Sequence, residues 1–209
     1  MRINNNMSNI NFGIKGWDIK SSSPNADYYY KGSQKPNCFV GCEFKEPVNI
    51  KKGLEQIWND TSLNHRIKNA REVVETINKY KDFKLYGITG IGSTTTTFDI
   101  GDEKVLKVSL ENPYQFREYE PKFDIPLIDK VEKTKNNIYA YIQAKADMDK
   151  TVEKDVIEVI NRIKEAGYEP TIDIQPSKLE QVGWYKGKPW LVDIRCAVTK
   201  NFSRFFKHI

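Results

Sequence analysis

Apolar side chains between residues 50 and 81 follow the period of an α-helix. They recur at steps of three and four residues, at Leu54, Ile57 and Trp58 and then at Ile67, Ala70, Val73, Val74, Ile77 and Tyr80. Such spacing places them on one side of a helix and leaves the other side to charged residues. The segment therefore predicts one short and one longer amphipathic helix.

The pattern changes at Asp82 to one typical of β-strands. Residues 83–90, 94–100 and 104–110 are rich in β-branched and aromatic side chains and are separated by glycines, which favours three antiparallel strands. A helix is expected over residues 112–120, followed by two further strands over residues 126–133 and 136–146. The expected product is a five-stranded antiparallel sheet with one helix inserted after its third strand.

A second long amphipathic segment covers residues 151–166. Its apolar stripe is followed by Gly167, a residue that commonly ends helices, and its first turn carries acidic side chains. Beyond it, the sequence predicts a loop, a hairpin that turns at residues 185–189, and a last strand that ends at an aspartate. The stripe consists of Val156, Ile157, Val159, Ile160 and Ile163.

These elements predict an α+β protein with three parts. Residues 1–49 are expected to form a polar, partly flexible region, because Asn, Ser, Gly and Lys dominate most of it. Residues 50–81 form a helical extension, and residues 82–209 form a mixed domain. A chain of 209 residues is long enough to bury a substantial core.

Composition narrows the range of partners. The net charge of +5 comes from 33 basic and 28 acidic residues interleaved along the chain, without the dense basic stripe that phosphate backbones require, so nucleic acid is not expected. No apolar run has the length of a membrane span or of a secretory signal. These features favour a cytoplasmic protein, and delivery into another cell by a specialised secretion system stays open.

Cysteine spacing raises one alternative. Cys38 and Cys42 are four residues apart, a spacing seen among zinc ligands, and His65 and His208 are the only imidazoles in the chain. With so few partners, we interpret the cysteines as small buried hydrophobic residues instead.

A glycine-containing turn and a lysine lie among the first three predicted strands. At Gly90 and Gly92, backbone amides can approach phosphate oxygens because no Cβ is in the way. The spacing differs from a P-loop, and a strand rather than a helix follows. Lys107 lies between valines, and an inward-pointing lysine requires an anionic partner. Glu118 and Glu120, in the helix expected next, are the candidates.

Two aspartates follow the long helix. Asp173 lies in TIDIQPSK and Asp193 ends the strand of LVDIR, with the predicted hairpin between them. Protein kinases place a catalytic-loop aspartate, a hairpin and the D-F-G aspartate in this order. Together with the glycine turn and the lysine, five elements agree in order and distance.

Residues 83 to about 197 thus resemble a minimal, atypical protein kinase, closest to the small effector kinases that bacterial pathogens inject into host cells. GIGSTTTTF is similar to a short glycine loop of the form G-x-G-S-T, at Gly90, Gly92 and Ser93, and VLKV matches the strand-three lysine at Lys107. The resemblance implies a protein-kinase-like fold with a five-stranded antiparallel N-lobe sheet and a much reduced helical C-lobe.

The sequence also departs from the family pattern. LVDIR resembles a D-F-R variant of D-F-G, with Ile194 for Phe and Arg195 for Gly. The residues before Asp173 are not His-Arg, and Lys178 stands where the family has the Asn that holds a second magnesium ion. An ammonium group cannot bind a metal, although it can neutralise phosphate charge.

The resemblance implies ATP and Mg²⁺ as cofactors and a protein, expected in a host cell, as substrate or partner. Asp173 would orient or deprotonate the attacking hydroxyl, Lys107 would contact the phosphates, and Asp193 would bind Mg²⁺. The residues assigned to the nucleotide are Gly90, Gly92, Ser93, Thr94, Lys107, Glu118, Glu120 and Lys178.

Three functions follow as alternatives. The first is an ATP-dependent protein kinase that transfers the γ-phosphoryl group to a protein hydroxyl. The second is a catalytically impaired pseudokinase or binding module that engages a partner protein, which the lysine at position 178 favours. The third is a structural protein of a phage or secretion particle, suggested by the Asn-rich start. Taken singly, the glycines are compatible with an ordinary hairpin turn, Lys107 with a solvated strand lysine, and the aspartates with loop caps.

Overall fold

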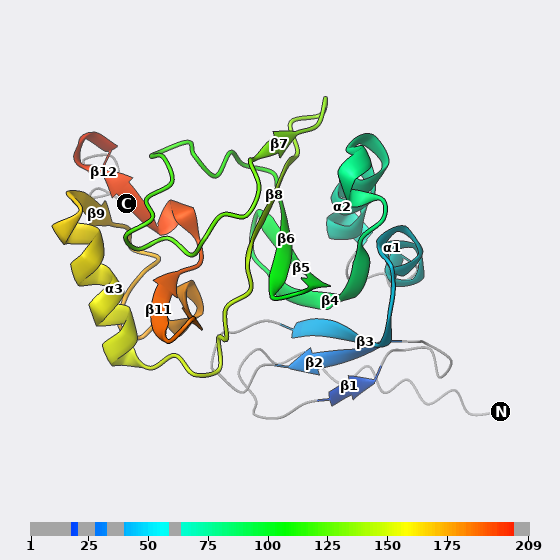
Figure 1. Cartoon of the computed structure of the whole chain (residues 1–209), viewed down its shortest axis with the longest axis horizontal. Coiled ribbons are helices and arrows are strands. Elements are labelled where there is room, and N and C mark those ends of the chain that lie inside the picture. Colours follow the sequence, from blue (N-terminus) through cyan, green and yellow to red (C-terminus); the bar gives the residue numbers. More distant parts are fainter. Residues whose placement is uncertain (1–17, 21–27, 33–39, 59–63, 203–209) are drawn as a thin grey trace.

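The computed structural model describes residues 18–20, 28–32, 40–58 and 64–202. Of the residues considered for zinc, Cys38, His208 and the side chain of His65 lie outside this part, and Cys42 lies within it. In the described part the chain is an α+β protein built on one antiparallel sheet with the strand order β1-β2-β3-β4-β5-β6-β8-β7 (Figure 1). The strands are β1 (Asp18–Lys20), β2 (Tyr28–Gly32), β3 (Val40–Asn49), β4 (Lys84–Ile91), β5 (Thr95–Gly101), β6 (Lys104–Ser109), β7 (Glu132–Lys133) and β8 (Tyr139–Ala144).

Four of the five strands expected from the sequence are confirmed, the one expected over residues 126–133 is reduced to the two-residue β7, and three strands precede them. β3 comes from the segment expected to be polar and partly flexible, yet it pairs with β4 on both sides of an irregularity between Glu43 and Val48. Gly87 permits this pairing because it has no side chain. A Cβ added there would lie 2.1 Å from the carbonyl oxygen of Cys42 on β3. Cys42 itself is buried in the core beside this strand pair.

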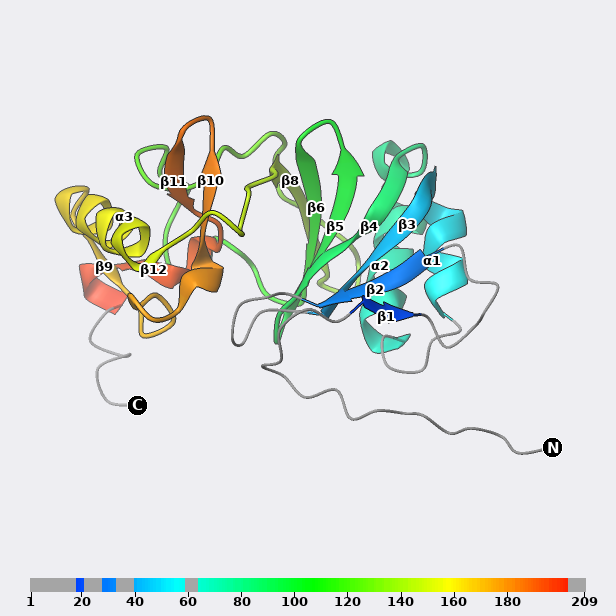
Figure 2. The ribbon, with the colours of Figure 1, turned by 90° about the horizontal axis from the view of Figure 1, so that it is seen from below.

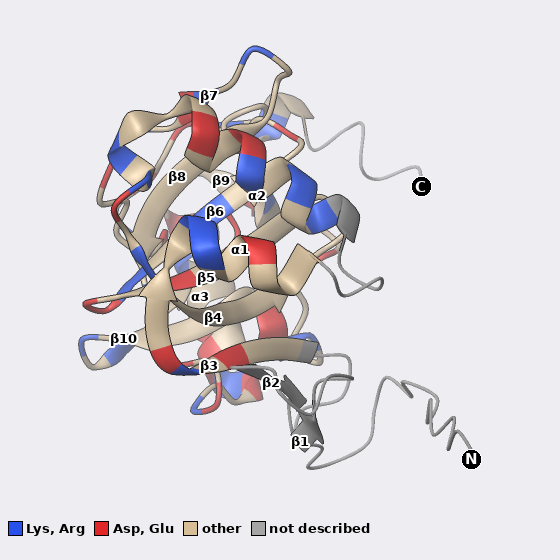
Figure 3. Cartoon of the chain, turned by 90° about the vertical axis from the view of Figure 1, so that its right-hand side faces the viewer, with Lys and Arg blue, Asp and Glu red and all other residues tan. Residues whose placement is uncertain are grey.

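The two helices expected between residues 50 and 81 are confirmed as α1 (Ile50–Trp58) and α2 (Asn64–Thr76). Both cover the same face of the sheet (Figure 2). Their outer surfaces carry interspersed basic and acidic residues (Figure 3). None of the helices in the described part has the length and apolar character needed to span a bilayer. The core between helices and sheet includes Ile50, Leu54, Ile57, Ile67, Ala70, Val73, Val74, Leu85, Ile88, Phe98, Leu106, Val108, Ala140 and Ile142.

The prediction of a helix after the third strand is wrong. Residues 112–120 form turns and irregular backbone instead. The guanidinium of Arg117 is buried and binds both carboxylate oxygens of Asp124 at 2.5 Å, and its Nε donates to the carbonyl of Ala197 at 2.9 Å. A helix over this segment would not form this loop-shaped network, and Pro121 disfavours helical backbone at Glu120.

The second half of the chain is organised around α3 (Glu153–Glu165), the helix expected over residues 151–166. Asp155 in its first turn accepts a hydrogen bond from the amide of Val152 at 2.9 Å, and Gly167 ends it with a φ of +87°. The expected hairpin is also confirmed, with a two-residue turn in which Lys186 and Gly187 both have positive φ. The strands here are β9 (Tyr168–Pro170), β10 (Val182–Tyr185), β11 (Lys188–Leu191) and β12 (Ala197–Thr199).

Backbone hydrogen bonds join the two halves next to the hairpin. The amide of Leu191 donates to the carbonyl of Phe123, and the amide of Ile125 donates to the carbonyl of Leu191. A second connection runs between Asp147 and Trp184, which exchange backbone hydrogen bonds in both directions. The residues that follow β11 are therefore fixed against the sheet, on the side opposite α1 and α2 (Figures 1 and 2).

Candidate functional site

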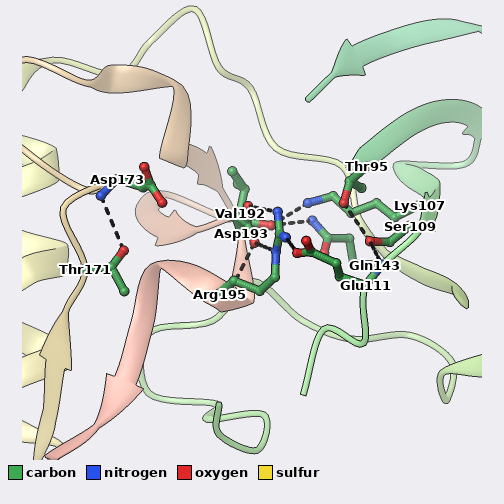
Figure 4. A network of polar contacts seen from close by, with 10 residues as sticks. All are labelled: Thr95, Lys107, Ser109, Glu111, Gln143, Thr171, Asp173, Val192, Asp193 and Arg195. Atoms are coloured by element: carbon green, nitrogen blue, oxygen red, sulfur yellow. Dashed lines mark hydrogen bonds and ion pairs between the residues drawn. The ribbon is translucent and has the colours of Figure 1, made fainter. Parts of the chain in front are cut away.

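Lys107 lies in the middle of β6 and points away from the helices. Its neighbours Leu106 and Val108 face the core under α1 and α2, and strand alternation turns Lys107 to the other face. There its Nζ donates to the carbonyl oxygen of Val192 at 2.5 Å, and Nε2 of Gln143 donates to the same oxygen at 3.2 Å (Figure 4). Lys107 thus reaches the segment that carries Asp193.

The side chain of Lys107 is a buried titratable group. It is 7% exposed, and burial lowers its pKa, while the negative charge of Asp193 opposes part of that effect. A buried ammonium is costly unless an anion compensates it. The Lys107 ammonium therefore favours an additional anionic ligand on this face of the sheet.

Asp193 follows β11 and caps a short 3-10 helix, Ile194–Cys196. Its Oδ1 accepts the amide of Arg195 at 3.0 Å, and its Oδ2 lies 3.4 Å from the guanidinium of the same residue. Burial opposes its charge, but Lys107 and Arg195 outweigh burial and hold the pKa of Asp193 below its ordinary value. The carboxylate is therefore ionised at neutral pH.

Arg195 connects this carboxylate to a second one. Its guanidinium forms an ion pair with Glu111, which lies just beyond the end of β6 (Figure 4). The site thus contains alternating charges contributed by both halves of the chain. The cations are Lys107 and Arg195, and the anions are Asp193 and Glu111. A phosphate bound here would lie near two positive charges that the fold already holds in position.

The structure does not bring the expected glutamates to Lys107. The carbonyl of Glu118 accepts a hydrogen bond from Arg117, while the amide of Glu120 donates to Asp124 and its carboxylate accepts from the amide of Lys122. Among the described residues, no ion pair joins Lys107 to either glutamate. The acid that acts on Lys107 is Asp193.

The glycine turn lies at the end of the β4–β5 hairpin. The amide of Gly92 donates to the carbonyl of Thr95 at 2.7 Å, and Gly90 pairs with Thr97, the residue that also faces Lys107 in the sheet. Ser93 is exposed at the tip, and Thr94 follows it. The turn therefore lies at the start of β5, the strand that pairs with Lys107 on β6.

Asp173 and Lys178 lie together in the loop after β9. Nζ of Lys178 is 3.9 Å from Oδ1 of Asp173 and donates to the carbonyl of Ile172 at 3.1 Å. The side chain of Asp173 is 67% exposed, which leaves it open to a second molecule. Burial raises the pKa of the Cys196 thiol well above its usual value, and the negative charges of Asp193 and Asp173 add to this effect.

The donor set fits Mg²⁺ only in a limited way. Mg²⁺ is commonly held by one or two carboxylates together with substrate phosphates and water. Asp193 supplies one ionised carboxylate, while Lys178 and Arg195 supply positive charge and no ligand. A cation at Asp193 would thus depend on phosphate oxygens for its other ligands.

Sequence patterns missed Glu111, Gln143 and Arg66 as members of this site and missed the ionic contacts of Arg195. Glu111 reaches the guanidinium of Arg195, and Gln143 reaches the carbonyl of Val192, only because segments distant in the sequence meet there. Arg195 had a signal, since it lies two residues after an aspartate at a strand end. Arg66 of α2, whose guanidinium donates to the carbonyl of Ser93 at 2.5 Å, had none.

Comparison of the chain with family models, with curated proteins and with solved structures returned no match.

Proposed function

We propose that the chain is an ATP- and Mg²⁺-dependent protein-kinase-like phosphotransferase that transfers the γ-phosphoryl group to a protein hydroxyl. The observation that carries this proposal is the convergence of buried Lys107 and ionised Asp193 beside the carbonyl of Val192. These residues come from the two segments whose sequences resemble the strand-three lysine and the D-F-G aspartate.

Each part of the site has a role in phosphoryl transfer. The amides of the Gly90–Thr94 turn would cover the nucleotide phosphates, and Lys107 would neutralise part of their charge. Asp193 would hold Mg²⁺, which supplies further charge neutralisation when bound. Such catalysis depends on position and charge, which the rigid strands β6 and β11 provide.

The acceptor would approach Asp173. This carboxylate is exposed and can accept the proton of an attacking hydroxyl, whose oxygen forms a bond to phosphorus as the bond to the ADP leaving group breaks. Lys178, next to Asp173, would neutralise charge on the transferred group. The family resemblance makes a host-cell protein the expected acceptor.

One observation favours a second candidate, a binding module with impaired catalysis. Arg195 contacts both oxygens of Asp193 and competes there with a metal ion. Together with Lys178 at the usual Asn position, this arrangement would permit nucleotide or partner binding with slow transfer or none.

A thermal-shift titration followed by a transfer assay tests the proposal. ATP with Mg²⁺ at about a hundredfold over its Kd should add about 2.7 kcal/mol to the stability of the wild type. The variant Lys107→Met should lose this shift, whereas Lys104→Met, on the same strand, should retain it. Absence of a shift at millimolar nucleotide would reject the nucleotide site.

Transfer of labelled phosphate separates the two candidates. The wild type should label an added protein mixture or itself, and Asp193→Ala should not, while Asp149→Ala at an exposed position should behave as the wild type. Nucleotide binding without transfer by the wild type would support the binding module.

A further inference from the structure

A hydrogen bond joins the N-terminal helical extension to the glycine turn. Arg66 lies in the first turn of α2, and its guanidinium donates to the carbonyl oxygen of Ser93 at 2.5 Å. The two residues are 27 positions apart in the sequence. Helix α2 is on the face of the sheet opposite Lys107, so this contact reaches the turn from behind.

Other hydrogen bonds also hold the turn, among them one from Oγ1 of Thr95 to Oγ of Ser109 at 2.9 Å. The Gly92 amide closes it on Thr95 at 2.7 Å, and the carbonyl of Thr94 accepts the amide of Leu110 at 3.0 Å. Ser93 is exposed at the tip. The guanidinium of Arg66 is partly buried, which lowers its pKa, and its Nε has no hydrogen-bond partner among the described residues. In the part of the chain that the structure describes, this partly buried cation makes its hydrogen bond to the Ser93 carbonyl.

Helix α2 is itself fixed without Arg66. Its apolar side, including Ile67 and Val73, is buried against the sheet. Further along the helix, the carboxylate of Glu72 accepts hydrogen bonds from Oγ1 of Thr134 at 2.6 Å and from Nδ2 of Asn136 at 2.9 Å. The helix therefore provides a rigid support from which Arg66 reaches the turn.

We propose that Arg66 is a positioning residue that holds the glycine turn in the conformation that binds nucleotide phosphates. The inference rests on the proposed function and gives the N-terminal extension a role in it. Loss of the bond would let the tip move, so the amides of the turn would spend less time in the orientation that phosphate requires. Arg66 thus acts on nucleotide affinity and not on the transfer step.

Hydrogen exchange of the nucleotide-free protein tests the structural half. Arg66→Gln should speed exchange in the peptide that contains Gly92 by about tenfold, since a hydrogen bond from a charged group is lost. Arg66→Lys should restore part of the protection, because an ammonium can still donate to the Ser93 carbonyl. Lys68→Gln, exposed on the same helix, should leave exchange unchanged. Equal exchange in wild type and Arg66→Gln would overturn the proposal.

Steady-state kinetics test the functional half. Arg66→Gln should raise the KM for ATP about fivefold to tenfold with kcat within about twofold of the wild type, and Arg66→Lys should lie between them. Faster hydrogen exchange in the turn of Arg66→Gln with an unchanged KM for ATP, or a fall in kcat alone, would overturn the proposal. If the wild type binds no ATP, the proposed function fails, and the exchange data alone decide whether Arg66 fixes the turn.

Discussion

The ammonium group of Lys107 donates a hydrogen bond to the carbonyl oxygen of Val192, across 85 positions of the sequence. The contact joins the middle of the sheet to the segment that follows the β10–β11 hairpin. Because Gln143 donates to the same oxygen, two neighbouring strands hold this carbonyl. Asp193, the next residue, is thereby fixed close to the lysine charge.

The first prediction is that the buried charge of Lys107 lowers the free energy of unfolding. Burial lowers the pKa of Lys107, so the folded chain disfavours its charge, and an apolar side chain of similar volume avoids this desolvation cost. We expect Lys107→Met to unfold in urea with an unchanged or higher free energy of unfolding, by up to about 3 kcal/mol, while nucleotide binding is lost. Asp193 keeps Arg195 as its partner in this variant. A destabilised Lys107→Met protein would show that the lysine is retained for the fold.

The second prediction concerns the metal requirement. Arg195 places a positive charge 3.4 Å from Oδ2 of Asp193, which repels a cation at that carboxylate. We expect Arg195→Gln to reduce the Mg²⁺ concentration needed for half-maximal ATP binding by about fivefold, equivalent to about 1 kcal/mol of removed repulsion. Titration of Mg²⁺ at fixed ATP measures it. A higher requirement in the variant would mean that Arg195 instead assists metal binding.

The third prediction is a pH dependence of stability. The pKa of Asp193 is lower in the folded chain than the value of about 3.9 for an unfolded one. Its contribution to folding is therefore complete above about pH 5 and is lost as the pH falls through the folded-state pKa. The difference in unfolding free energy between the wild type and Asp193→Asn should be largest at neutral pH and should shrink below about pH 4.

Urea unfolding at a series of pH values measures this difference. Asp149→Asn, at an exposed position, is the matched control and should follow the wild type throughout. A wild-type to Asp193→Asn difference that stays constant from neutral to acidic pH would contradict the assigned ion pairing.

The fourth prediction concerns the buried pair of Arg117 and Asp124. Their side chains are 1% and 0% exposed. Removal of one partner leaves an uncompensated buried charge, so Arg117→Met and Asp124→Leu should each cost about 3–5 kcal/mol. The double variant should cost less than the sum of the two, as a double-mutant cycle measures. Additive losses would show that the two side chains act independently.

Local pattern in the sequence determined the elements. The three- and four-residue spacing in residues 50–81 and 151–166 predicted α1, α2 and α3, because a helix segregates its apolar side chains by short-range geometry alone. Glycine and β-branched residues likewise predicted β4, β5, β6 and the β10–β11 hairpin. The sequence also predicted an α+β protein with an antiparallel sheet, which the structure confirms.

Pairing over long distances was decided only by the tertiary structure. The strand status of residues 40–49 depends on β4 as a partner, and the irregular backbone of residues 112–120 depends on the bond between Arg117 and Asp124. Neither leaves a periodic signal in the chain.

The site divides in the same way. Residue types and order pointed to Lys107, Asp173 and Asp193, since a lysine among valines and an aspartate at a strand end are visible locally. Their partners were not visible: Lys107 donates to the Val192 carbonyl and is influenced by the charge of Asp193 rather than by Glu118 or Glu120, and Arg66 bonds to the glycine turn. The physical reason is that a strand or helix sets the direction of a side chain, whereas only the packed fold decides which distant group it meets.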